Sequence, residues 1–540
     1  MSAPISKELA AQERLLPFLL DPHSYPHRPK RVRLVQTHTS FVFLVPPFVY
    51  KVKKPVNFGF LNFSTLERRR HFCAREVALN RRLSPAMYLG VVPIAVRGGR
   101  FVFGEGEEVV EYAVQLRKLS DGHFLDGLVE RGAVGRPEIN RLAVALTAFY
   151  RAQQPTEEIE AWGRIEKLRI STDENFRQTG PFIGQTLSRP AFETIRAFTE
   201  GCYSRHARRF AARVRGRWIR DCHGDLHLEH IHLTPRALHI YDCIEFNDRF
   251  RYVDVASDAA FLAMDLDAKG RPDLARHFVA KMAAGLRDPG MLRLMDFYKC
   301  YRACVRGKVE SLHSIAHAAP DAERAASAER ARSYFRLALR YAVAGSRPLA
   351  VVVMGRIASG KSVLAAALAG ELGWEVVSSD RVRKELAGFP LYERTNEAAR
   401  ARLYSGAMTA RTYARLFAAA AAAARSHRGI VLDATFASRA QREQMRARFD
   451  RRGIDWCVVE AHADDRTVRR RLRERAARPE EISDARLDDF AALTRLYEPP
   501  AELPKNQRVQ VRTTVPPAAA LTAALTALAR RQLTNPCPAP

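Results

Sequence analysis

The 540-residue sequence predicts two domains: an α+β domain over residues 1–345 and an α/β domain, with a doubly wound parallel sheet, over residues 346–540. The length exceeds what one hydrophobic core usually organises. Residues 41–53 alternate as in a β-hairpin before a mainly helical region, whereas strands and helices alternate after Pro348. An Ala- and Arg-rich helix ends at Gly345, just before this proline. Gly followed by Pro stops a helix, so the domain boundary is expected there.

The first domain opens with a helical lead and then short β-type runs. Residues 41–45 and 48–53 form the expected hairpin, and an amphipathic helix over residues 65–83 carries Glu76. Further elements follow in chain order: strands at 101–103 and 109–116, helices over 137–210 and helices over 253–314. A small sheet near the N-terminus and a helical remainder are therefore expected.

Acidic and histidine residues gather between the two helical regions. The sequence reads His223-Gly224-Asp225-Leu226-His227, with His230 three residues on, and a short strand then leads to Asp242. One carboxylate in a loop and another after a strand can serve an attacking hydroxyl and a metal ion, respectively. This stretch resembles the catalytic loop of aminoglycoside phosphotransferases and related small-molecule kinases.

The resemblance covers most of residues 35–320 and implies a two-lobed, protein-kinase-like fold. It implies that Asp225 is the catalytic base, that Asp242 binds metal, and that Asp258 helps to hold the loop. It also implies that Lys51 grips the α- and β-phosphates of ATP, with Glu76 as its helix-borne partner. Lys53 lies on the same face of the strand as Lys51, so the choice between the two lysines stays open.

Two positions depart from the family pattern. His230 stands where the related kinases usually have Asn, and an imidazole nitrogen is a poor ligand for Mg²⁺. Residues 36–40 lack the glycine that a phosphate-covering hairpin often has. His230 is kept as a candidate metal ligand, but a pseudo-kinase is an alternative for this half. A second alternative is a transition-metal site formed by four histidines, His223, His227, His230 and His232.

The second domain contains the most specific motif of the chain. Residues 355–362 read Gly-Arg-Ile-Ala-Ser-Gly-Lys-Ser, which is the P-loop pattern G-x-x-x-x-G-K-S, between an apolar strand and a helix. Backbone N–H groups of such a loop cradle phosphates, while its lysine reaches the terminal phosphates and its serine a Mg²⁺ ion. The candidate nucleotide-binding residues are Gly355, Ala358, Ser359, Gly360, Lys361, Ser362 and Val363.

Further strands at 375–378, 429–434, 456–460 and 508–512 predict a parallel sheet with helices on both faces. Asp380 follows the second strand and is expected to accept a hydroxyl proton, with Arg381 or Arg383 contacting the acceptor; an N-cap role for Asp380 is the alternative. Asp433 ends an apolar strand and is a candidate metal ligand. An arginine-rich helix over 465–478 resembles the lid of P-loop kinases, with the catalytic candidates Arg475 and Arg478.

The composition limits the kinds of partner that are expected for the protein. The net charge of +28 makes nucleic acid possible, but the excess arginine is dispersed among alanine, and ATP needs only a local basic patch. No apolar run approaches the roughly 20 residues that span a membrane, and residues 1–20 are charged where a secretory signal would be apolar. Eight scattered cysteines form no compact framework. A cytoplasmic protein without membrane partners is therefore expected.

The two halves together look like a bacterial two-module family, in which an aminoglycoside phosphotransferase-like domain is fused to a P-loop kinase domain. The C-terminal half resembles AAA-type, zeta toxin-type and polynucleotide 5′-hydroxyl kinases. This resemblance implies ATP-dependent phosphoryl transfer, with Mg²⁺, to a hydroxyl-bearing and small acceptor. A nucleic-acid end-processing enzyme and a non-catalytic nucleotide sensor are the alternatives.

Overall fold

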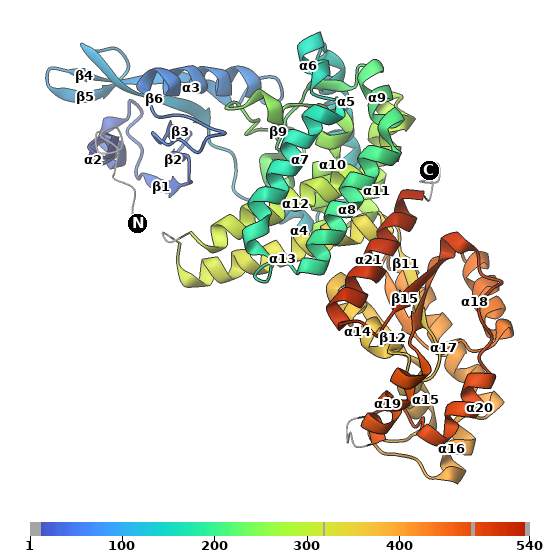
Figure 1. The fold of residues 1–540 in the computed structure, drawn as a ribbon. Helices are drawn as coiled ribbons and strands as arrows, with labels where there is room; N and C mark the ends of the chain where they lie inside the picture. Colours follow the sequence, from blue (N-terminus) through green and yellow to red (C-terminus); the bar gives the residue numbers. More distant parts are fainter. Residues whose placement is uncertain (1–11, 317–318, 477–480, 535–540) are drawn as a thin grey trace. The chain divides into compact units, whose positions relative to one another are not determined.

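The computed structural model describes residues 12–316, 319–476 and 481–534 (Figure 1). They form two compact units: unit 1 is drawn from residues 1–168 and 209–292, and unit 2 from residues 169–208 and 293–540. The helices on either side of residue 345 thus belong to the same compact unit as the P-loop sheet. The division of the chain into domains at residue 345 stays a prediction.

Unit 1 begins with a six-stranded antiparallel sheet in the order β1-β2-β3-β6-β4-β5. Helix α2 (Leu16–Leu20) packs on one face beside Phe43 and Val52, and α3 (Leu66–Asn80) packs on the other face beside Val114. The hairpin, the two later strands and the helix carrying Glu76 confirm the predictions, whereas β1 and β4 were not predicted. The strands are β1 (Arg33–Gln36), β2 (Ser40–Val45), β3 (Phe48–Lys53), β4 (Tyr88–Arg97), β5 (Arg100–Phe103) and β6 (Glu108–Arg117).

The rest of unit 1 is mainly helical, as expected. The loop with Asp225 lies between two short antiparallel strand pairs, β7 with β10 and β8 with β9. The likeness of unit 1 to the protein-kinase fold stays a prediction. Its elements are α4 (Leu125–Glu130), α5 (Arg136–Ala152), α6 (Glu157–Ala161), β7 (Ile219–Asp221), β8 (Ile231–Leu233), β9 (Leu238–Ile240), β10 (Tyr252–Asp254), α10 (Val255–Ala268) and α11 (Pro272–Leu286). Helices α7 (Ile165–Thr179) and α9 (Ala207–Arg215) each contribute residues to both units.

Unit 2 contains a five-stranded sheet whose neighbouring strands are all parallel, as predicted. Its order is β12-β13-β11-β14-β15, so successive strands are added on both sides of β11. Ligands of such sheets bind at the carboxyl ends of the strands, where the strand order reverses. The strands are β11 (Leu349–Met354), β12 (Glu375–Ser378), β13 (Ile430–Asp433), β14 (Asp455–His462) and β15 (Arg508–Arg512).

Helices cover both faces of this sheet (Figure 1). On one face, α17 and α18 enclose the apolar side chains of Val352, Leu432 and Trp456. On the other face lie α14 and α21, and α21 also packs against α8. The helices are α8 (Arg189–Arg205), α12 (Met295–Ser314), α13 (Asp321–Ala344), α14 (Lys361–Leu372), α15 (Ser379–Ala387), α16 (Glu397–Leu403), α17 (Gly406–Arg425), α18 (Arg439–Arg451), α19 (Asp465–Ala476), α20 (Phe490–Arg495) and α21 (Pro517–Thr534).

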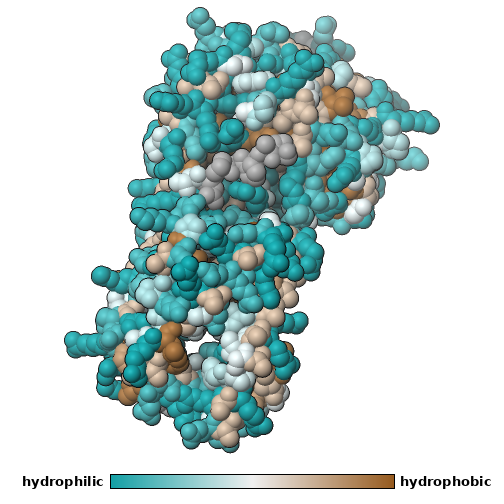
Figure 2. Space-filling view, turned by 90° about the vertical axis from the view of Figure 1, so that its right-hand side faces the viewer, coloured by the Kyte–Doolittle hydropathy of each residue, from teal (hydrophilic) through white to brown (hydrophobic). Residues whose placement is uncertain are grey.

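The surface is mostly polar where Figure 2 displays it. Hydrophilic residues cover most of that face, and hydrophobic residues are scattered among them. Among the described residues, none of the helices combines the length and the apolar character that crossing a bilayer requires.

Candidate functional site

The predicted P-loop lies between β11 and α14, at the carboxyl edge of the sheet. Its backbone takes left-handed angles at Gly355 (φ +151°), Ala358 (φ +50°) and Gly360 (φ +89°). A Cβ atom on Gly355 would come within 2.6 Å of the carbonyl oxygen of Ala461, so this turn requires glycine. Helix α14 starts at Lys361, whose side chain is only 9% exposed. The loop therefore ends at a helix N-terminus, which is the arrangement that favours phosphate.

Two strand ends bring carboxylate and hydroxyl groups to this loop. Asp433, at the end of β13, is 4% exposed, and burial raises its pKa, whereas Lys361 and hydrogen bonds from the Ser362 and Ser378 side chains lower it. Its Oδ1 atom is buried without a hydrogen-bond partner among the described residues. A buried carboxylate oxygen beside a P-loop serine, with nothing bonded to it, fits a Mg²⁺ ligand.

Asp380 lies in the first turn of α15, where Arg383 Nη1 is 3.1 Å from its Oδ1 atom. Ser378 occupies the N-cap position, so the alternative N-cap role for Asp380 is wrong. Arg381 is exposed, whereas Arg383 is buried and stacks on the ring of Tyr404. Of the two candidate arginines, Arg383 is therefore the one that contacts Asp380.

A cavity of about 240 Å³ opens beside the P-loop and α14. Arg471 of α19 connects its walls, because Nη1 donates to the carbonyl of Ala358 at 3.4 Å and lies 3.3 Å from Thr513 Oγ1. The Thr513 hydroxyl in turn donates to the carbonyl of Ser359. Thr513 was not among the predicted site residues, although it follows the last strand, β15, at the same sheet edge. The cavity is lined by Gly360, Val363, Leu364, Ala367, Arg471, Glu474, Arg475, Thr513, Val515, Pro517 and Ala520.

Arg475 and Arg478 are the two predicted lid arginines. Arg475 lines the cavity, and its Nε atom is 3.5 Å from the carboxylate of Glu481. Arg478 lies outside the described residues.

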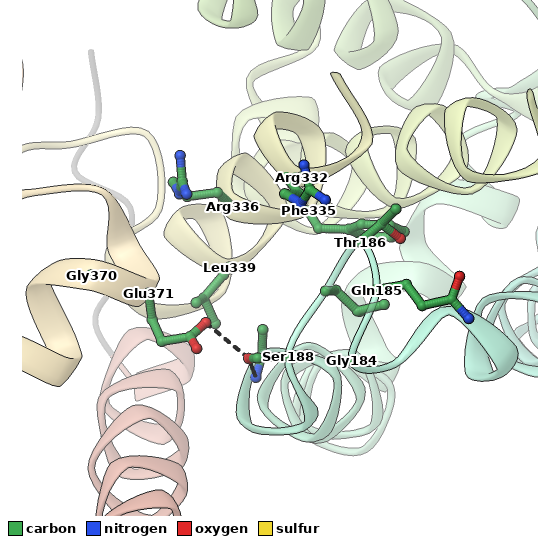
Figure 3. A pocket seen from close by; sticks show the side chains of 12 residues that line it. Gly184, Gln185, Thr186, Ser188, Arg332, Phe335, Arg336, Leu339, Gly370 and Glu371 are labelled. Carbon is green, nitrogen blue, oxygen red and sulfur yellow. Dashed lines mark hydrogen bonds between the residues drawn. The ribbon is translucent and has the colours of Figure 1, made fainter. Parts of the chain in front are cut away.

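Unit 2 also has a second hollow, of about 310 Å³, whose lining residues are drawn in Figure 3. Gly370 and Glu371 of its wall belong to the last turn of α14, and the Ser188 hydroxyl donates to Glu371 at 2.9 Å. An α-helix rises about 1.5 Å per residue, so this end of α14 lies about 15 Å from Lys361 along the helix axis. The hollow is therefore distinct from the candidate nucleotide site.

In unit 1, both candidate lysines meet the same glutamate. Lys51 Nζ is 3.0 Å from Glu76 and 2.8 Å from Asp242, while Lys53 Nζ is 2.6 Å from Glu76 and also contacts Glu245. Burial opposes ionisation of Asp242, but Lys51 and His230 outweigh it and lower the pKa of this carboxyl. Both lysines therefore pair with Glu76, and Lys51 alone of the two also meets Asp242.

Asp258 holds the loop that carries Asp225, as expected. Its carboxylate accepts hydrogen bonds from the backbone N–H groups of His223 and Gly224, both at 2.9 Å, and from the hydroxyl of Tyr150 at 2.8 Å. Gly224 has φ +88°, and a Cβ there would lie 2.8 Å from the carbonyl oxygen of Phe250. Asp258 therefore fixes a tight turn just before Asp225.

Asp258→Ala is expected to lower the free energy of unfolding of unit 1 by about 3 kcal/mol, because three buried donors lose their acceptor at about 1 kcal/mol each. Urea denaturation followed by circular dichroism measures this change. Asp273→Ala, which removes an exposed partner of Arg271, is the control and should change the free energy by less than about 0.5 kcal/mol. Equal effects of the two substitutions would contradict the role given to Asp258.

The four-histidine metal site is wrong, because two of the four rings are engaged elsewhere. His223 accepts the N–H of Asp225 at Nδ1 and donates from Nε2 to the carbonyl of Tyr241, and burial lowers its pKa to about 4. His232 Nε2 contacts Ser120. His227 and His230 remain beside Asp225, with ligand atoms of all three residues within 4.8 Å of one another.

Comparison with known proteins gives a family for part of unit 2 and relatives for most of the chain. Residues 351–500 match the model of the AAA domain family. The solved structures that resemble the chain include a gluconokinase from Sinorhizobium meliloti 1021 (21% identity, TM-score 0.24, 34% of this chain and 93% of that one). They also include the Mycobacterium tuberculosis APS kinase CysC in complex with AMPPNP and APS (20% identity, TM-score 0.26, 34% and 98%). Likenesses at these TM-scores assign neither fold nor substrate.

Curated relatives cover most of the chain. Uncharacterized proteins of Mycobacterium tuberculosis and of Mycobacterium bovis are each 32% identical to the chain over 412 residues, which is 76% of this chain and 79% of theirs. Over that length and at that identity, the chain belongs to the family of these mycobacterial proteins.

Proposed function

We propose that the protein is an ATP-dependent phosphotransferase whose P-loop, in unit 2, passes the γ-phosphoryl group of ATP to the hydroxyl of a small molecule. The observation that carries this proposal is the position of Asp380 and Asp433. Asp433 ends β13, which neighbours the P-loop strand β11, and Asp380 comes two residues after β12, which neighbours β13. Asp380 also contributes to the pKa of Asp433. Phosphate-binding backbone, lysine and two carboxylates thus share one edge of the sheet.

Each P-loop residue has a role in holding the nucleotide. The backbone from Gly355 to Val363 surrounds the phosphates, and Lys361 neutralises charge on the terminal ones. Ser362 and Asp433 would hold Mg²⁺, since a hydroxyl and a buried carboxylate oxygen without a partner are suitable oxygen ligands. The ion, when bound, supplies further charge neutralisation on the phosphates. The cavity beside Val363, Leu364 and Thr513 has room for part of the nucleoside.

Asp380 is proposed to act as the general base on the acceptor hydroxyl. Its carboxylate takes the hydroxyl proton as the oxygen attacks the γ-phosphorus, and Arg383, 3.1 Å away, orients the carboxylate. Arg475, with Arg478, is proposed to offset negative charge around the acceptor and the transferring group.

Unit 1 offers a second candidate site for the same chemistry. Its Lys51, Glu76 and Asp242 are connected by ion pairs of 3.0 and 2.8 Å, and Asp225 lies in the loop that Asp258 fixes. With Asp225 as base, this site could also transfer phosphate, or it could bind nucleotide without catalysis.

A screen of full-length protein with γ-labelled ATP and Mg²⁺ tests the proposal. The acceptors are sugars, polyols, sugar acids, nucleosides and oligonucleotides with 5′-hydroxyl ends. Label on a small hydroxyl compound, lost in Lys361→Ala and kept in Asp225→Ala, is the expected result. Label on oligonucleotides would favour the end-processing enzyme that the charge of +28 suggests. ATP binding without transfer to any acceptor would favour the nucleotide sensor, and transfer that only Asp225→Ala abolishes would assign the chemistry to unit 1.

A further inference from the structure

Opposite charges line the second hollow of unit 2, at the far end of the P-loop helix α14 (Figure 3). Glu371 lies on the wall that the last turn of α14 forms. Arg332 and Arg336 lie on the wall that α13 forms, and residues 184–188, before α8, form a third side. The hollow therefore has one acidic wall and one basic wall.

The charges of the two walls are not paired with each other. Among the described residues, neither Arg336 nor Glu371 takes part in an ion pair. The Glu371 carboxylate accepts a hydrogen bond from the Ser188 hydroxyl at 2.9 Å, and Arg332 bonds through Nη1 to the exposed Glu329 at 3.0 Å. Opposite charges that share a hollow without a contact are complementary to a ligand that carries both charges.

The basic wall is one face of α13. Arg332, Arg336 and Arg340 follow one another at intervals of four residues, so they lie along the same side of the helix. Arg340 donates to the carbonyls of Leu372 and Gly373 at the end of α14, at 2.6 and 3.1 Å. Burial and the nearby charge of Arg336 lower the pKa of Arg340. A carboxylate bound beside Arg336 would offset this repulsion between guanidinium groups.

The acidic wall has two sources of negative potential. Glu371 lies in the last turn of α14, where the helix dipole has its negative end. The hydrogen bond from Ser188 reaches Oε2 of Glu371, and Oε1 has no hydrogen-bond partner among the described residues. This oxygen is therefore available to an ammonium group.

The floor between the two walls is apolar. A buried leucine and a buried phenylalanine of α13, with two buried residues at the start of α8 and just before it, supply the apolar part of the lining: Leu187, Ala191, Phe335 and Leu339. A ligand with charged groups for the walls and an apolar group for this floor would bury that group away from water.

We propose that this hollow binds a free α-amino acid with an apolar side chain. Its carboxylate pairs with Arg336 and Arg332, its ammonium group pairs with Glu371, and its side chain lies on the apolar floor. Along the axis of α14 the site is about 15 Å from Lys361, and it uses no residue that is assigned to phosphoryl transfer. The proposed function and this proposal therefore fail separately.

Isothermal titration calorimetry of the full-length protein with L-leucine, L-methionine and L-phenylalanine tests the proposal. We expect saturable binding of one equivalent of at least one of them. The best of the three is then compared with two analogues, one without the ammonium group and one without the carboxylate. Each analogue should bind at least about 10-fold more weakly, because it loses one charge-assisted contact. Hydrogen–deuterium exchange should show protection at residues 184–191 and 370–371.

Substitutions on the two walls locate the site. Arg336→Gln and Glu371→Gln should each lower the affinity for the amino acid by about 10- to 100-fold while the circular dichroism spectrum stays unchanged. Arg324→Gln is the matched control, since Arg324 is an arginine of α13 outside the hollow that pairs with the exposed Asp321, and it should leave binding unchanged.

Three results would overturn the proposal. The first is that folded wild-type protein binds none of the three amino acids. The second is that an analogue with one charge binds as tightly as the amino acid, which would indicate a site for a simple anion or cation. The third is that Arg336→Gln or Glu371→Gln leaves the affinity unchanged.

Discussion

Replacing Lys361 with alanine is expected to lower the rate of phosphoryl transfer by about 100- to 1000-fold. Lys361 lies at the first position of α14 and is nearly buried, so its ammonium group acts where water screens it little. Removing a single well-placed donor to a developing charge typically costs 100- to 1000-fold in rate, as an order of magnitude. The measurement is transfer from γ-labelled ATP, at saturating acceptor, by full-length protein.

Lys505→Ala is the matched control for this substitution. Lys505 is an exposed lysine of unit 2, outside the residues that line the P-loop cavity. Its removal should leave the rate within about twofold. If Lys361→Ala retained more than a tenth of the wild-type rate, the P-loop would not be the site of transfer.

Asp380→Asn is expected to lower kcat by about 100- to 10,000-fold while the affinity for ATP stays within about threefold. Asparagine keeps the size of the side chain but cannot take a proton, and Asp380 is expected to contact the acceptor rather than the phosphates. Rate and affinity are measured separately, by transfer assays and by equilibrium titration with ATP. Arg383→Lys, which keeps the charge but loses the planar group beside Asp380, should lower kcat less.

Equal losses of ATP affinity and kcat in Asp380→Asn would contradict a role for Asp380 as base. Such a result would place Asp380 among the nucleotide-binding or metal-binding groups, beside Asp433. Arg381→Ala should have little effect on either quantity, because its side chain is exposed and Arg383 makes the contact to Asp380.

The strands and loop of unit 2 could be predicted because their signals are local. An apolar run before Gly355, and two glycines in a fixed spacing, define the P-loop without knowledge of the rest of the chain. The parallel sheet follows from the alternation of strands and helices, since each crossover needs a helix. Asp433 and Asp380 could be predicted because the first ends a strand and the second comes two residues after one.

Other features depend on contacts between distant segments. Strand β4 contains Gly90 and Pro93, which interrupt a strand pattern; the structure accommodates them in a strand with irregular register between Tyr88 and Gly90. Strand β1 is short and largely exposed at the sheet edge, so it has no apolar alternation.

The candidate site shows the same limit. Arg471 reaches the P-loop only because α19 and the end of β15 lie beside it, and no spacing in an arginine-rich helix distinguishes it from its neighbours. The choice of Arg383 over Arg381 could have been predicted from the sequence. Residues three apart on a helix share a face, so Arg383 is the natural partner of Asp380.

Equilibrium titration of the full-length protein with ATP, in the presence of Mg²⁺, tests the central claim most directly. The account predicts saturable binding at a P-loop site that Lys361→Ala removes and that Lys51→Ala leaves intact. Saturable binding that is insensitive to Lys361→Ala, or no saturable binding by folded wild-type protein, would contradict it.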